Sequence, residues 1–250
     1  MTDNEVIKKR LIELSRRAYD TGADIYTDFL SMAEQSTLAS VKQELYSPYL
    51  LYGGAGERER RIVRFGTDTD DTAKFPIACL MISPRSAKFA QKLSHRDYLG
   101  ALMSIGLDRS KLGDIVIDGS DAYVFCRDEM KEFIARSVDS VARTSVKCEI
   151  VDSIPEHMTD ETHEITVQVA SIRLDALVAK VYRLSREESS ALIKQGRVYV
   201  NAVLCESPSR EPKDEDIVSV RGFGRFKLLG KTGTGKKGKA NVLIARFGRG

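Results

Sequence analysis

Residues 172–201 read IRLDALVAKVYRLSREESSALIKQGRVYVN, and this stretch decides the fold of the C-terminal part of the chain. Leu174 and Leu177 begin an apolar stripe at helical spacing, which predicts a first short helix. A second helix is expected to end at Gly196, and the alternating residues 197–200 then predict a strand. The stretch therefore predicts two short helices packed against a small sheet.

The start of the second helix is the first candidate site. Ser185 followed three residues later by Glu188 has the spacing of a capping box, so the helix is expected to begin at Ser185. Its first turn would present Arg186 beside backbone N–H groups and the positive end of the helix dipole. Such a helix start attracts phosphate.

The ordered motifs R-L-D, S-R, I-x-x-G and V-x-V-N within this stretch resemble the S4 RNA-binding domain, which we place at residues 171–230. The sequence departs from the family pattern at Ser189, at Ala202 and at residues 214–216. The resemblance implies that the two helices present a basic face to RNA, with Ser185 organising the helix start and Asp175 as an internal partner. It nominates as RNA contacts Arg173, Arg186, Lys194 and Arg197. Because phosphate contacts do not read bases, we expect recognition of RNA shape.

Charge is divided unevenly along the chain, whose formal net charge is +3. Up to residue 170 there are 22 basic and 28 acidic residues, and after it there are 17 basic and 8 acidic residues. A basic C-terminal third on an acidic body indicates that one module approaches phosphates. A solvated basic tail is the alternative.

The residues before the S4-like stretch predict two further domains, and the expected fold class is α+β. Residues 1–72 predict a small α/β domain that opens with an amphipathic helix over residues 3–20. Residues 73–165 predict the order βαββαβ of a ferredoxin-like, RRM-like domain. Residues 118–121, Asp-Gly-Ser-Asp, have the turn chemistry for a hairpin between its two middle strands.

Tyr123 and Phe125 are the only aromatic residues on the central strands of this middle domain that could stack on bases. They share one face of their strand by alternation, which suits core packing equally well. We favour the core interpretation.

Two segments are expected to be irregular. Residues 156–164 are polar and predict a loop or hairpin before the basic module. Residues 231–250 predict a basic, glycine-rich loop followed by a final strand over residues 242–247. Our hypothesis is that the loop is disordered and settles against RNA phosphates.

Three further segments resemble the bacterial YlmH family. They are residues 94–102 (SHRDYLGAL) with 109–115 (RSKLGDI), residues 53–61, and residues 220–227. The resemblance covers nearly the whole chain and implies a factor of ribosome-associated quality control. Such a factor binds a large ribosomal subunit that is still obstructed by peptidyl-tRNA. It contacts rRNA and peptidyl-tRNA together and supports tailing or rescue of the stalled chain.

Within this resemblance, two more surfaces are candidates for RNA contact. The middle domain offers His95, Arg96, Arg109 and Lys111, with Ser110 between the last two. A late strand is expected to carry Arg221, Arg225 and Lys227 on one face, interleaved with Phe223 and Phe226. A solvated strand edge is the alternative for that last set.

Other functional classes find little support in the sequence. The four cysteines contain no C-x-x-C pair and the three histidines lie near no cysteine cluster, so we expect no metal site and reduced, mostly buried thiols. The chain has no glycine-rich cofactor fingerprint and no evident nucleophile–base pair, so we expect no enzyme activity, cofactor or small-molecule substrate. Two alternatives stay open. One is an S4-domain rRNA-modifying enzyme of the pseudouridine synthase kind, and the other is an assembly or interaction adaptor linked to cell division.

The expected location is the cytoplasm. Residues 2–17 are charged at helical spacing, unlike a signal peptide, and the longest apolar run, residues 77–82, is too short to span a bilayer. The sequence does not identify the rRNA or tRNA elements contacted, the partner factors or the oligomeric state.

Overall fold

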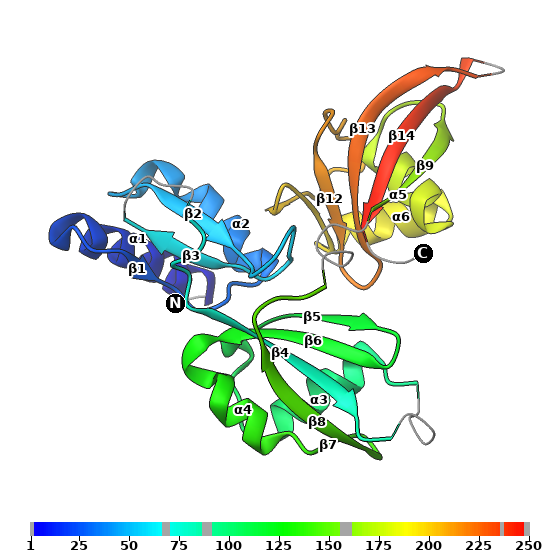
Figure 1. The fold of residues 1–250 in the computed structure, drawn as a ribbon. Coiled ribbons are helices and arrows are strands. Elements are labelled where there is room, and N and C mark those ends of the chain that lie inside the picture. Colours follow the sequence, from blue (N-terminus) through cyan, green and yellow to red (C-terminus); the bar gives the residue numbers. More distant parts are fainter. Residues whose placement is uncertain (1–2, 67–70, 87–91, 156–161, 236–237, 248–250) are drawn as a thin grey trace. The chain divides into compact units, whose positions relative to one another are not determined.

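The computed structural model describes residues 3–66, 71–86, 92–155, 162–235 and 238–247. The chain divides into two compact units, which are described separately below. The first comprises Met1–Glu34 and Ser40–Thr159, and the second comprises Gln35–Ala39 and Asp160–Gly250. Helices combined with antiparallel sheets confirm the predicted α+β class (Figure 1).

The N-terminal part of the first unit carries a three-stranded antiparallel sheet in the order β1-β3-β2. Its elements are α1 (Asp3–Thr21), β1 (Ile25–Tyr26), η1 (Lys42–Glu44), β2 (Tyr49–Tyr52) and β3 (Ile62–Phe65). Helix α2 (Met32–Ser40) is divided, because its residues Gln35–Ala39 belong to the second unit. Helix α1 confirms the predicted amphipathic helix, and it buries Leu11 and Ala18. Every residue of β3 is buried, so this strand is the centre of the small domain.

The middle part of the first unit has the predicted order βαββαβ. Its elements are β4 (Ile77–Pro84), α3 (His95–Ser104), η3 (Arg109–Lys111), β5 (Leu112–Asp118), β6 (Asp121–Arg127), η4 (Asp128–Met130), α4 (Lys131–Ser137), β7 (Ser140–Val141) and β8 (Thr144–Val151). The strands lie in the order β5-β6-β4-β8-β7 with antiparallel neighbours. This is the split βαβ arrangement with β7 added at one edge. The predicted hairpin turn is present, because β5 ends at Asp118 and pairs there with Asp121.

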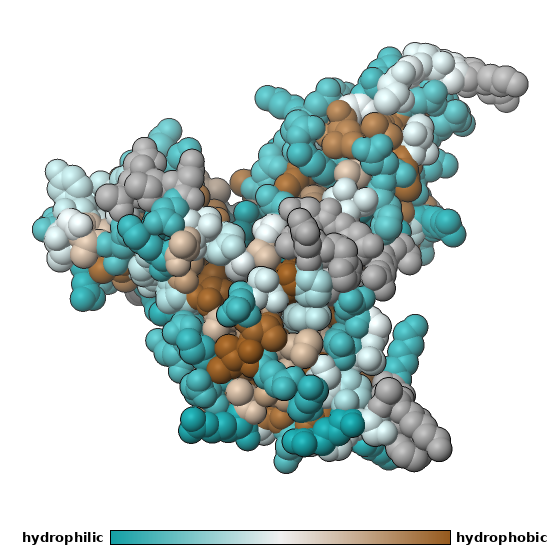
Figure 2. All heavy atoms as spheres, viewed as in Figure 1, coloured by the Kyte–Doolittle hydropathy of each residue, from teal (hydrophilic) through white to brown (hydrophobic). Residues whose placement is uncertain are grey.

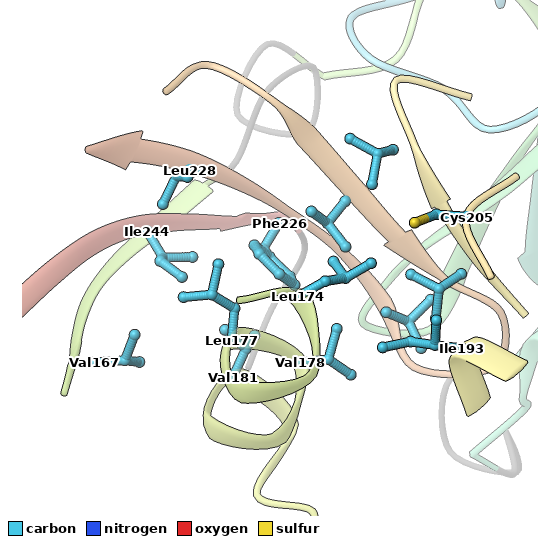
Figure 3. Close-up of a cluster of buried hydrophobic side chains, with 14 of the residues drawn as sticks. Val167, Leu174, Leu177, Val178, Val181, Ile193, Cys205, Phe226, Leu228 and Ile244 are labelled. Carbon is cyan, nitrogen blue, oxygen red and sulfur yellow. The ribbon is translucent and has the colours of Figure 1, made fainter. Parts of the chain in front are cut away.

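The second unit packs two helices against a six-stranded sheet in the order β11-β10-β12-β13-β14-β9. Its elements are β9 (Thr162–Val169), α5 (Leu174–Tyr182), α6 (Arg186–Lys194), β10 (Val198–Val200), β11 (Val203–Leu204), β12 (Ile217–Val220), β13 (Gly224–Thr234) and β14 (Ala240–Phe247). The core between them includes Leu174, Leu177 and Val181 of α5, which face Phe226 and Ile244 of the sheet (Figure 3). The predicted helix pair is therefore confirmed.

Two predicted irregular segments are partly strands. Residues 162–164 belong to β9, which pairs with β14 along its whole length, from Thr162 opposite Phe247 to Val169 opposite Ala240. Residues 231–234 belong to β13, which pairs with β14 as far as Thr234 and absorbs its glycines at two register shifts. The loop predictions were wrong there because β14 supplies the backbone partners, from far along the chain for β9 and across a hairpin for β13. Residues 156–161 and 236–237 lie outside the described residues.

The turn between β10 and β11 has an unusual residue in it. Asn201 and Ala202 both have positive φ angles, 50° and 63°, and Val200 pairs with Val203 across the turn. This is the conformation of a two-residue hairpin turn that favours Asn-Gly. Alanine at the second position is strained because its Cβ is unfavourable in the left-handed region.

We expect Ala202→Gly to raise the free energy of unfolding of the second unit by about 0.5–1 kcal/mol, since glycine removes this strain. Urea unfolding followed by circular dichroism measures the change. Ala191→Gly on α6 is the matched control and should lower the same quantity by about 1 kcal/mol, because glycine there is inside a helix. An equal loss in both variants would contradict the assignment of strain to Ala202.

Candidate RNA-binding surface

The side chain of Asp175 joins the two helices of the S4-like module. Its carboxylate is 3 % exposed and accepts hydrogen bonds from Arg173 at 3.2 and 2.9 Å and from Arg186 Nε at 3.2 Å. The expectation that Asp175 is an internal partner is confirmed. The two guanidinium groups are 34 % and 59 % exposed, so both reach solvent while one buried carboxylate orients them. Arg186 uses only Nε on Asp175, which leaves its terminal nitrogens for further acceptors.

The ends of α6 have the predicted caps. Ser185 Oγ accepts a hydrogen bond from the Glu188 backbone N–H, and the Glu188 carboxylate accepts one from the Ser185 N–H at 2.7 Å. Hydrogen bonds to its carboxylate from the Ser185 backbone N–H and from the Ser185 side chain lower the pKa of Glu188. At the other end, the N–H of Gly196 bonds to Ile193 and that of Arg197 bonds to Leu192, which is a Schellman motif. The caps fix the backbone positions of Arg186 at the start of α6 and Arg197 just after its end.

Ser189 occupies a position where the S4 pattern usually has alanine. Its side chain is fully buried, and its hydroxyl donates a 2.8 Å hydrogen bond to the carbonyl of Asp175. The extra oxygen therefore has a partner, and it ties α6 to α5 beside the Asp175 carboxylate. The departure from the pattern adds a contact between the helices and does not disturb the packing.

The three basic residues expected on one late strand have different environments. Arg221 lies in the turn that joins β12 to β13, so its placement on a strand was wrong. The strand ends there because Gly222 turns the chain with a φ of +87°. Arg197 donates a 2.9 Å hydrogen bond to the carbonyl of Arg221 and holds this turn.

Arg225 and Lys227 do lie on β13, as predicted. Arg225 stacks over the ring of Phe247, 4.9 Å from its centroid, and Lys227 forms an ion pair with Glu215. Of the two interleaved aromatics, Phe226 is fully buried and Phe223 is exposed. The charge of Lys227 is thus neutralised by Glu215 within the module. Lys194, at the end of α6, is exposed to solvent.

The face of the middle sheet that could stack on bases is covered. Tyr123 and Phe125 are 9 % and 2 % exposed and belong to a buried cluster with Phe29 and Ile62 of the N-terminal part. Figure 2 shows that further hydrophobic residues over the strands of this sheet reach the surface. The core interpretation is the one that the structure supports, because the N-terminal part occupies the place that a base would take.

Residues 53–61 build this junction. Gly54 lies so close to Phe125 that an added Cβ would be 2.4 Å from its ring. Arg58 is buried and stacks over the same ring at 5.5 Å. Arg60 donates hydrogen bonds to the carbonyls of Leu112, Phe29 and Arg109. The segment that resembles a family motif therefore joins the N-terminal part to the middle sheet.

Arg109 and Lys111 also serve this junction. Arg109 donates to the carbonyls of Leu112 and Gly113 at 2.7 and 3.1 Å. Burial, followed by the charge of Arg60, lowers its pKa to about 10, so it stays charged at neutral pH. Lys111 Nζ lies 3.0 Å from the carboxylate of Asp28 and 2.9 Å from that of Glu129. Because these contacts engage both charges, we leave the two residues out of the proposed RNA surface.

His95 and Arg96 are placed differently, since both are exposed in the first turn of α3. The helix begins with a capping box between Ser94 and Asp97. Desolvation by surrounding protein atoms and the nearby Arg109 lower the pKa of His95 below its usual 6.5. At neutral pH, Arg96 is therefore the residue of this pair that offers a positive charge to phosphate.

Burial raises the pKa values of the Cys79 and Cys126 thiols to about 12, so both stay protonated at neutral pH. Within the described residues there is no group of three or more His, Cys, Asp or Glu side chains that could hold a metal ion. No helix in the described parts of the chain is long and apolar enough to cross a membrane.

Two basic residues at the end of α5 were not among the predicted RNA contacts. Lys180 and Arg183 are exposed and lie three residues apart, next to Arg186 of the following helix. Their spacing is a helical one, and it could have marked a second basic row beside the apolar stripe.

Two family models match this chain. Residues 71–154 match the model described as "Putative RNA-binding domain in YlmH", and residues 172–218 match the S4 domain. A relative from Bacillus subtilis (strain 168), named ribosome-associated protein quality control protein P2, is 33 % identical over 229 residues, which cover 88 % of this chain and 86 % of the relative. The chain belongs to the YlmH family. The resemblance noted in the sequence is thereby confirmed.

A solved structure is also similar to this YlmH-family chain. It is the cell division protein ylmH from Streptococcus pneumoniae, with a TM-score of 0.49 and 19 % sequence identity. The match covers 60 % of this chain and 92 % of that one.

Proposed function

We propose that this YlmH-family protein is a non-enzymatic RNA-binding factor of ribosome-associated quality control in the cytoplasm. In this proposal it binds rRNA and peptidyl-tRNA on the large ribosomal subunit and supports rescue of the stalled nascent chain. The name of the Bacillus subtilis relative supports the pathway. The observation that carries the RNA contact is the pair of arginines, Arg173 before α5 and Arg186 at the start of α6, that reach solvent while the buried Asp175 carboxylate orients them.

The proposed contact surface consists of a central set and a peripheral set. The central set surrounds the ends of α6 and comprises Arg173, Ser185, Arg186, Lys194 and Arg197. The peripheral set comprises Arg221 and Arg225. Arg96, in the first unit, is proposed as a separate RNA contact. The N–H donors of a helix start and oriented guanidinium groups are suited to bind phosphate oxygens. Contacts to phosphate position the protein on the RNA and do not read its base sequence. The surface therefore favours structured RNA recognised by its shape.

Sedimentation of cell lysate through a sucrose gradient tests this function. We expect tagged wild-type protein to travel with large ribosomal subunits that retain peptidyl-tRNA, and the Arg186→Glu/Arg197→Glu variant to stay at the top of the gradient. Both proteins remaining at the top would reject ribosome association. Formation of pseudouridine in rRNA by the purified protein would instead favour the rRNA-modifying alternative.

A further inference from the structure

A groove of about 570 Å³ runs along the outer side of α5 in the second unit. One wall is the end of β9 with residues 170–171, and the other is α5 with the residues that lead into α6. Lys239, just before β14, contributes from the β13–β14 hairpin. All of these segments belong to one compact unit, so the groove is a feature of the S4-like module itself.

The lining of the groove has small side chains between its charges. Ala170, Ser171, Ala176 and Ala179 extend little beyond Cβ, so a bound chain could approach the protein backbone closely. The remaining polar side chain is the amide of Gln168, which can donate and accept hydrogen bonds. An open lining with small side chains leaves room for an extended polymer beside the backbone.

The charge of the groove is entirely positive. Its lining includes Lys180, Arg183, Arg186 and Lys239, and none of the described residues that line it is acidic. Four cations along one open groove create a positive potential that attracts a polyanion. Arg186 belongs to both the groove and the surface at the start of α6, so the two are continuous.

Arg183, which lines the groove, has a strained backbone conformation. It ends α5 in the left-handed region, with φ 56° and ψ 38°. Glycine is the usual residue at such a helix end, because an L-residue there is strained. The exposed side chain of Arg183 lines the groove, so this strained position carries one of the groove's four cations.

We propose that this groove binds the phosphodiester backbone of an RNA strand and extends the RNA contact of the module along α5. The proposal rests on the proposed function, in which the module binds RNA. It adds Lys180, Arg183 and Lys239 to the contact residues. It also predicts that strain at Arg183 is retained for binding at the expense of stability.

The test uses the full chain, a fluorescein-labelled RNA stem–loop and the variant Lys180→Ala/Arg183→Gly. We expect weaker binding and a slope of log Kd against log salt concentration that is smaller by about 1.4 to 1.8, since each lost phosphate contact contributes about 0.7 to 0.9. The melting temperature should not fall, because glycine relieves the strain at residue 183. The control Arg136→Ala/Lys213→Ala removes two exposed charges outside the groove and should retain the wild-type slope.

The possible results separate this proposal from the proposed function. If Arg197→Glu weakens binding but Lys180→Ala/Arg183→Gly retains the wild-type affinity and slope, the groove is not an RNA contact and the function stands. If wild-type protein does not bind the stem–loop in any salt concentration, both proposals are rejected.

Discussion

Arg186→Glu is expected to lower RNA affinity by about 2–3 kcal/mol, or roughly 30- to 150-fold, because hydrogen bonds to charged groups have about this strength. The substitution replaces an attraction for phosphate with a repulsion at a helix start. Fluorescence anisotropy with a labelled RNA stem–loop measures the loss. Arg136→Glu makes the same charge change at an exposed position of α4 and should leave the affinity within about twofold of wild type.

The same substitution also affects the fold, and the two effects have to be separated. Arg186 Nε lies 3.2 Å from the buried carboxylate of Asp175, so a glutamate there faces a like charge. We therefore expect a lower melting temperature for Arg186→Glu, and a smaller decrease for Arg186→Gln. If Arg186→Gln keeps the fold and still binds RNA as tightly as wild type, the surface at the start of α6 is not the main contact.

Phe125→Ala is expected to lower the free energy of unfolding of the first unit by about 3–5 kcal/mol. Phe125 is 2 % exposed, and Gly54, Arg58 and Phe29 surround its ring, so truncation leaves a cavity at the junction. Urea unfolding together with hydrogen exchange of β4 and β6 measures the loss. Phe133→Ala, which truncates a phenylalanine that is 44 % exposed on α4, should cost less than about 1 kcal/mol.

A volume-conserving variant separates core packing from base stacking at the same position. Phe125→Leu should fold with a modest loss of stability and bind RNA as tightly as wild type. A folded Phe125→Leu protein with clearly weaker RNA binding would show that the middle sheet contacts RNA through this face.

Much of the S4-like module could be predicted because its signals are local. The apolar stripe of α5, the Ser185–Glu188 capping box and the glycine after α6 each act within one or two helical turns. The βαββαβ order of the middle domain was equally accessible, since alternation and a two-residue turn mark its strands. The sequence predicted only that Asp175 has an internal partner. It did not identify Arg186 as that partner, because Arg186 is eleven residues away.

Contacts between distant segments decided the rest. Strand β9 forms by pairing with β14, about eighty residues later, so its polar first residues, 162–164, alone read as a loop or hairpin. Arg109 and Lys111 are basic and follow a loop, which is typical of an RNA contact, yet Asp28 and backbone carbonyls at the junction engage them.

The sequence by itself thus determined the family, the order of the elements and the capped helix start, because these depend on local patterns. Only the tertiary structure decided which cations face solvent, that Tyr123 and Phe125 are core residues, and that Lys180 and Arg183 share a groove with Lys239. The physical reason is that burial and ion pairing depend on which distant segments pack together, and residue spacing along the chain does not specify this.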